Sequence, residues 1–118
     1  MMQIRMVRGE IFCFPFRIYI DGEKTDEAMD DIFFTVKKHH YDRAVVFQKK
    51  LSAGTIHTDG NGNFMLRIDP EDTDQLDRGS YDFDVEIEKL PWIKRTFNGV
   101  LELTREVTFR EDEGAGRG

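Results

Sequence analysis

The sequence predicts an all-β protein, an immunoglobulin-like antiparallel β-sandwich of seven to nine short strands with one short helical turn. Two observations lead to this fold class. In residues 79–88, the apolar Tyr81, Phe83, Val85 and Ile87 alternate with four acidic residues, the pattern of a strand with one face on a core and one in water. Turn-forming residues also recur about every ten positions, a spacing typical of short antiparallel strands. A small closed barrel is the alternative.

The composition indicates one acidic domain without a disulfide. The chain has 118 residues, 34% of them charged, and a formal net charge of −6, which disfavours binding to nucleic acid or to an anionic membrane. No apolar run approaches the roughly 20 residues of a transmembrane helix, and the start lacks a signal-peptide pattern, so we expect synthesis in the cytoplasm. Residues 1–110 are expected to form the sandwich and residues 111–118 a flexible polar tail. The single cysteine, Cys13, lies between apolar residues, which predicts a buried, inert thiol.

The first half of the chain is predicted to form strands separated by turns. The expected strands cover residues 3–7, 11–20, 31–38 and 45–51. Pro15 lies inside the second of them and cannot donate a ladder hydrogen bond, which places that strand at a sheet edge or at a bulge. In the fourth strand, Val45 and Phe47 are expected to point inward.

The second half is predicted to contain a hairpin, the helical turn and the closing strands. Strands at 55–58 and 63–68 flank an Asp-Gly-Asn-Gly turn, a strong hairpin signal. A short helix is expected over 69–76, because Asp69 can cap it and Pro70 suits its first position. After the strand at 79–88, residues 92–97 form the next strand, Asn98 and Gly99 a tight turn, and residues 100–110 the last strand.

Metal and catalytic patterns do not hold together in this sequence. Asp59, Asn61 and Asn63 resemble the start of a calcium loop, but Phe64 replaces the required glycine and Pro70 the required glutamate. The histidines at 39, 40 and 57 and the lone cysteine lack zinc-ligand spacing, and no serine stands in a nucleophile context. We therefore expect no cofactor, no metal and no enzymatic activity.

The residues best suited to a protein interface are charged. Asp82, Asp84 and Glu86 form part of an acidic row that could meet lysines of a neighbouring strand or subunit, with Lys37 and Lys49 among the candidates. A plain solvent-facing acidic stripe explains the same residues.

One aromatic residue extends the interface hypothesis. Trp92 follows Pro91, where it is either an exposed interface anchor or part of the core.

The order of several motifs resembles small proteins from the structural gene clusters of tailed phages and prophages, and the immunoglobulin-like N-terminal domain of phage baseplate upper proteins. The motifs are DIFFTVKK at 31–38, VFQKKL at 46–51, IDPEDT at 68–73, GSYDFDV at 79–85, GVLEL at 99–103 and EVT at 106–108. The resemblance implies a β-sandwich without catalysis that docks onto other tail or baseplate subunits, often in symmetric rings. Baseplate upper proteins continue into long receptor-linking regions, whereas this sequence ends soon after the last motif, which favours a small accessory or adaptor subunit.

The functional expectation is therefore a non-enzymatic virion component, associated with a phage or prophage tail or baseplate. Its expected partners are other tail or baseplate proteins or further copies of itself, and neither nucleic acid nor membrane. The alternative is a carbohydrate- or surface-recognition β-sandwich, because sandwiches carry such sites on loops. That alternative predicts exposed aromatic side chains, with Trp92 and Tyr41 the first candidates.

Overall fold

The computed structural model describes residues 2–20, 22–24, 29–91 and 93–105, and these residues form ten strands and one helix. The elements are β1 (Met2–Val7), β2 (Phe12–Arg17), β3 (Tyr19–Ile20), β4 (Glu23–Lys24), β5 (Asp31–Lys37), β6 (Phe47–Lys50), β7 (Ile56–Thr58), β8 (Asn63–Ile68), α1 (Pro70–Thr73), β9 (Gly79–Lys89) and β10 (Ile93–Thr104). Eight strands build two sheets, while β3 and β4, of two residues each, pair only with one another. The four-residue helix is far too short to cross a membrane, and the described residues form no longer one.

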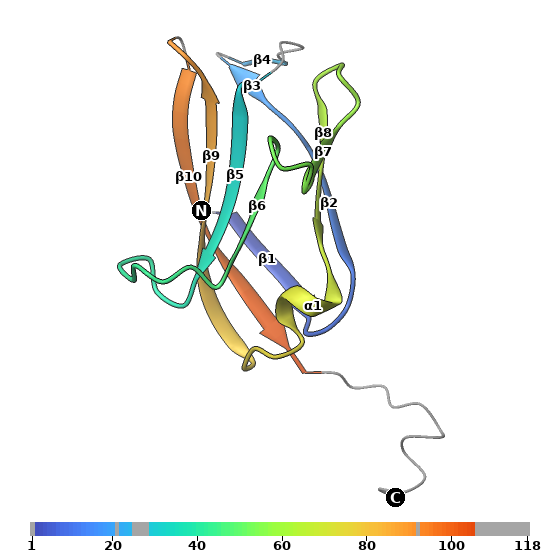
Figure 1. Cartoon of the computed structure of the whole chain (residues 1–118), viewed down its shortest axis with the longest axis vertical. Helices are drawn as coiled ribbons and strands as arrows, with labels where there is room; N and C mark the ends of the chain where they lie inside the picture. The colour runs from blue at the N-terminus through green and yellow to red at the C-terminus, as the bar shows by residue number, and fades with distance from the viewer. Residues whose placement is uncertain (1, 21, 25–28, 92, 106–118) are drawn as a thin grey trace, which may run out of the picture.

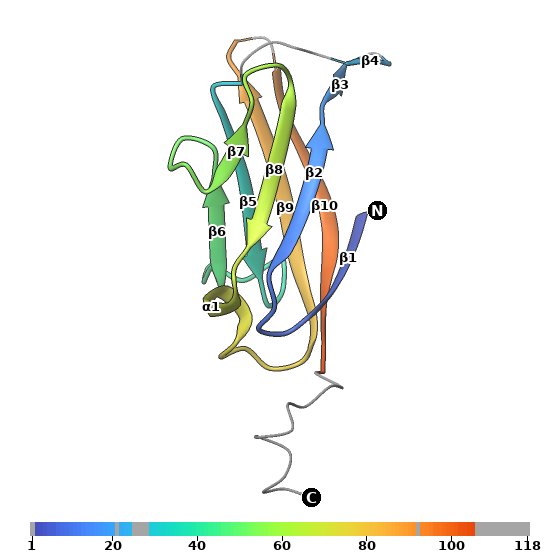
Figure 2. The ribbon, with the colours of Figure 1, turned by 90° about the vertical axis from the view of Figure 1, so that its right-hand side faces the viewer.

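The two sheets face each other as a sandwich, which confirms the predicted fold class (Figure 1). One sheet has the strand order β1-β10-β9-β5-β6 and the other β2-β8-β7, and the second view looks onto the three-stranded sheet (Figure 2). All pairs are antiparallel except β1 with β10, which run parallel. This is an immunoglobulin-like arrangement. The two sheets stay separate over the described residues, so the closed-barrel alternative does not apply.

The core lies between the sheets and is built from alternating positions, as the sequence predicts. On β9, Tyr81, Phe83 and Ile87 are buried, and the acidic residues between them point to the outer face. The ring centroids of Phe34 on β5 and Phe83 on β9 lie 5.0 Å apart. Apolar burial of this kind is the main favourable term in the free energy of folding. The described residues contain no disulfide that would add to it.

The connection from β8 to β9 combines the short helix with a buried tyrosine. The backbone N–H of Asp69 donates to the Asp72 carboxylate at 2.7 Å, and Pro70 opens the helix as predicted. The helix ends at Thr73 rather than near residue 76. The Tyr81 hydroxyl donates to the Asp77 carbonyl oxygen at 2.7 Å, which is the tyrosine corner of immunoglobulin-like sandwiches. Burial raises the pKa of Tyr81.

The predicted turn at Asn98 and Gly99 is wrong. β10 continues through both residues, and the chain reverses instead between the end of β9 and Ile93. Gly99 has a packing role, because a Cβ there would collide with the Phe83 ring and lie 2.7 Å from the Met2 carbonyl oxygen. The glycine thus allows the first strand and the core aromatic ring to approach β10 closely.

Two burial predictions are also wrong, while the edge prediction is confirmed. Cys13 is exposed, since it alternates with the inward-facing phenylalanines of β2. Val45 is 47% exposed, because β6 begins only at Phe47. β2, which contains Pro15, lies at the edge of its sheet, where a missing N–H donor is tolerated.

The last part of the predicted final strand and the tail, residues 106–118, lie outside the described residues.

Candidate interaction surfaces

The acidic row predicted on β9 lies on the outer face of the five-stranded sheet, between β5 and β10. Lys94 on β10 stands beside it, with its Nζ 3.7 Å from Glu86 Oε1 and 3.9 Å from Glu88 Oε1. Asp84, near the middle of the row, has Thr35 and Asn98 as cross-strand partners. Part of the row is therefore matched by a neighbouring strand of the same chain, in exposed ion pairs that contribute little stability.

The other end of the row meets the loop between β5 and β6. Asp82 accepts a hydrogen bond from the backbone N–H of His40 at 2.8 Å, and its Oδ2 lies 3.3 Å from His40 Nδ1. Lys37 is the cross-strand partner of Asp82, but its ammonium donates to the Asp42 carbonyl oxygen at 2.7 Å. The structure thus brings Lys37 and Asp82 together and uses both to hold this loop on the sheet.

This loop carries the most exposed of the phenylalanine and tyrosine residues that the structure describes. Tyr41 is 72% exposed, its ring stacks on His39 with centroids 5.2 Å apart, and it meets His40 edge-on at 5.4 Å. The other aromatic candidate, Trp92, lies outside the described residues.

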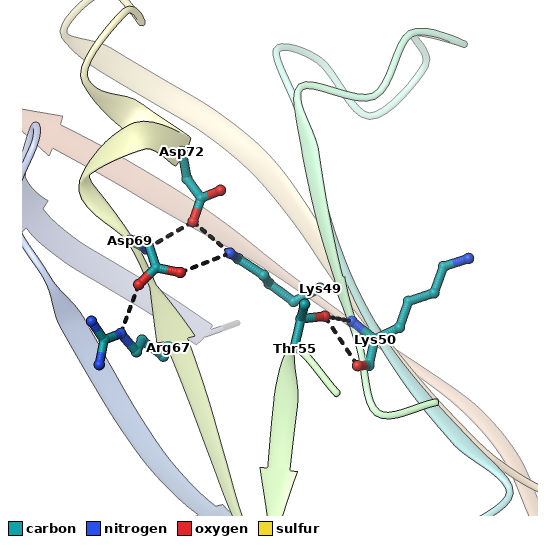
Figure 3. Close-up of polar contacts among 6 residues, drawn as sticks. All are labelled: Lys49, Lys50, Thr55, Arg67, Asp69 and Asp72. Atoms are coloured by element: carbon teal, nitrogen blue, oxygen red, sulfur yellow. Dashed lines mark hydrogen bonds and ion pairs between the residues drawn. The ribbon is translucent and has the colours of Figure 1, made fainter. Parts of the chain in front are cut away.

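Lys49, predicted as an interface residue, is instead buried inside the protein, where its ammonium contacts Asp69 and Asp72 (Figure 3). It is the cross-strand partner of the core residue Phe34, so its side chain points toward the opposite sheet. There its Nζ lies 2.6 Å from Asp72 Oδ2 and 3.4 Å from Asp69 Oδ2, and its side chain is only 9% exposed. The ion pair joins β6 to the start of α1, which directly follows β8 of the opposite sheet, so removing one partner would leave a partly buried charge uncompensated.

Arg67 extends this ion-pair network toward the surface. Its Nε donates to Asp69 Oδ1 at 2.6 Å. This hydrogen bond, together with the nearby charges of Lys49 and Arg67, outweighs burial and lowers the pKa of Asp69.

An apolar opening into the sandwich is the surface that the sequence analysis missed. A cavity of about 320 Å³ lies between the sheets, and its lining is almost entirely apolar. Its lining residues include Phe14, Phe16, Ile32, Phe83, Met2 and Phe97. Phe97 is 46% exposed and Met2 36%, so large apolar side chains reach water at its rim. We call this feature the inter-sheet opening.

Two strand edges belong to this opening. β1 pairs with β10 only from Gly99 to Thr104, so residues 93–98 of β10 have β9 as their one strand neighbour within the described chain. β2 pairs with β8 alone. A free strand edge presents backbone N–H and C=O groups that another strand can pair with. No residue pattern indicates the opening, because it depends on where β1 begins to pair with β10.

The described residues contain no cluster of three or more histidine, cysteine or acidic side chains that could hold a metal ion. Asp59, from the rejected calcium pattern, is instead engaged in the hairpin turn, where its carboxylate accepts hydrogen bonds from Asn61 and Asn63.

Comparison with protein-family models and with curated protein sequences finds no match to this chain.

Proposed function

We propose that this chain is a non-enzymatic virion component of a phage or prophage, a structural or adaptor subunit associated with the tail or baseplate. The observation that carries its binding role is the inter-sheet opening. Exposed apolar side chains beside unpaired strand edges are typical of surfaces that another protein covers. The order of the sequence motifs supports the phage assignment, and the immunoglobulin-like sandwich is the fold that this resemblance implies.

The proposed partners are other tail or baseplate proteins, or further copies of the same chain. The net charge of −6 disfavours nucleic acid and anionic membranes as partners. The ion pairs on the outer face of the five-stranded sheet would have to be exchanged for contacts with a partner, at little net gain. The inter-sheet opening is therefore the primary docking surface in this proposal, and the row containing Asp82, Asp84 and Glu86 a secondary one. The protein would be made in the cytoplasm and end in the virion.

The test is mass spectrometry of phage particles purified after induction of the source strain. We expect the chain in the particles, in a copy number that fits a symmetric ring. A strain that encodes Phe97→Asp should produce particles without the protein, because the charge lies at the rim of the opening. Val45→Asp, at an equally exposed position on the β5–β6 loop, is the matched control. Finding the wild-type chain only in the soluble lysate would refute the proposal.

A carbohydrate- or surface-recognition module is the second candidate function, and one observation favours it. Tyr41 projects from its loop with a histidine ring stacked on it, and sugars bind against exposed aromatic faces. A glycan array should then give a signal that Tyr41→Ala abolishes. An array without any signal dependent on Tyr41 would eliminate this candidate.

A further inference from the structure

We infer that the inter-sheet opening receives a β-strand from the C-terminal segment of a second copy of this chain, residues 106–113. The inference rests on the proposed function, because it names the partner and the binding mode of the same surface. An extended segment can pair its backbone with a free strand edge and insert alternate side chains into the space between the sheets.

The cavity suits apolar side chains on such a strand. Core residues such as Ile32 and Phe83 line its innermost part. The half-buried Phe14 and Phe16 of β2, together with Phe97 of β10, line its rim. The volume of about 320 Å³ is large enough for two apolar side chains of a strand.

Residues 106–113, Glu-Val-Thr-Phe-Arg-Glu-Asp-Glu, have the matching pattern. Val107 and Phe109 continue the alternation of Leu101 and Leu103, so both would lie on the face of a strand that points into the opening.

The charges of the segment and of the opening are complementary. Acidic residues at 111–113 follow Phe109. Arg17 lines the opening, and Arg95 is exposed on the core-facing side of β10, since its cross-strand partner is the buried Ile87. The arginines would therefore meet the acidic end of an inserted segment.

Geometry requires that the segment come from another copy. From Thr104, the five residues to Phe109 span at most about 18 Å when fully extended. Phe97 lies seven residues back along β10, about 23 Å away, and β1 already occupies the edge of β10 between them. Val107 has a still shorter reach. The apolar pair of one chain therefore cannot fill its own opening, whereas the pair of a neighbour can.

Insertion of this kind joins the copies head-to-tail, because each copy accepts a segment at its opening and donates a segment from another part of its chain. Such an interface closes into a ring if the rotation between neighbours allows it, and otherwise continues as a filament.

The first test measures assembly of the full-length protein by light scattering over a range of concentrations. We expect Phe109→Asp, in the donated segment, and Phe97→Asp, in the accepting surface, each to raise the concentration of half-assembly at least about tenfold, the effect of losing one buried aromatic side chain. Val45→Asp should leave it unchanged. Wild-type protein that stays monomeric at its highest soluble concentration, or assembly that neither variant weakens, would overturn the inference.

The second test is disulfide cross-linking between copies in a Cys13→Ser background. A Phe97→Cys protein mixed with a Phe109→Cys protein should give a mixed dimer on mild oxidation, and a Val45→Cys protein mixed with the same partner should not. Equal yields from both mixtures would contradict insertion. A third outcome also overturns the inference. If the wild-type protein is monomeric and its affinity for dodecanoic acid equals that of the Phe109→Asp variant, the opening is a small-molecule site.

The two proposals fail separately. If the chain is present in particles but residues 97 and 109 do not cross-link there, the proposed function stands and strand insertion is refuted. If the chain assembles through these residues in solution but is absent from particles, strand insertion stands and the virion role is refuted.

Discussion

Substitution of Lys49 by methionine gives the sharpest test of the packing between the two sheets. Methionine retains most of the apolar stem of lysine and removes the ammonium that lies 2.6 Å from Asp72 and 3.4 Å from Asp69. The two carboxylates then face each other across the start of α1 without their shared cation. Asp69 keeps its charged partner Arg67, whereas Asp72 keeps the hydrogen bond from the Asp69 backbone N–H but loses its cation, so Asp72 is the less compensated of the two.

The expected loss of stability is about 2–3 kcal/mol. A hydrogen bond to a charged group contributes roughly 1.5–3 kcal/mol, whereas removing one partner of a fully buried ion pair costs roughly 3–5 kcal/mol. The side chains of Asp72 and Asp69 are 16% and 29% exposed, so both carboxylates regain some hydration and the cost falls toward the lower range.

Urea denaturation measures the free energy of unfolding of each variant, and an unchanged m-value confirms that the loss reflects the native contact. Lys50→Met is the matched control. The Lys50 ammonium lies over the Phe33 ring at 5.7 Å on the outer face, so its loss should cost less than about 0.5 kcal/mol. The reasoning is refuted if the two methionine variants lose equal stability.

Four further outcomes follow from the fold. Gly99→Ala should destabilise the protein by about 1–3 kcal/mol in thermal or urea unfolding, because its Cβ would collide with the Phe83 ring; unchanged stability would contradict this packing. Tyr81→Phe should cost about 1–2 kcal/mol by the same measurement, since a partly buried carbonyl oxygen loses its donor. The pKa of Asp69 is lower in the folded state than in the unfolded chain. The ionised carboxylate therefore contributes its full stabilisation above about pH 4, and this stabilisation is lost as the pH falls through the folded pKa. When the free energy of unfolding is measured against pH, Asp69→Asn should lose less stability at acid pH than the wild type. Cys13 should react with a thiol reagent in the native protein as fast as in an unfolded control, because it is exposed.

The elements predicted correctly are those whose signal is local. The strand around Tyr81 could be predicted because strict alternation has one interpretation, and the hairpin at 59–62 because its turn chemistry lies within four residues. Pro15 likewise identified an edge strand, since a missing N–H restricts where a strand can lie.

The elements predicted wrongly depend on neighbours distant in sequence. Asn98 and Gly99 have the composition of a turn, but here the glycine accommodates the ring of Phe83 and the start of β1. Lys49 looks exposed because its carboxylate partners lie 20 and 23 positions later, at the start of α1 just after β8 of the opposite sheet. Cys13 differs from these cases, because alternation with the phenylalanines of β2 places it outward even though cysteine is usually a buried residue.

The interface candidates divide in the same way. The acidic residues Asp82, Asp84 and Glu86 do lie on one outer face, as alternation requires. The inter-sheet opening could not be predicted, because it requires knowing how far β1 extends along β10.

The parallel pairing of β1 with β10 also determines when this fold can be completed during synthesis. Each of its six residue pairs joins positions 97 apart in the chain, from Met2 with Gly99 to Val7 with Thr104. Among the described strands, the first in the chain therefore pairs with the last, and β9, which joins β5 to β10, is also late. Contacts of such high sequence separation form slowly. The growing chain must therefore keep its early apolar strands soluble until residue 104 has emerged from the ribosome, and the five-stranded sheet can be completed only after that point.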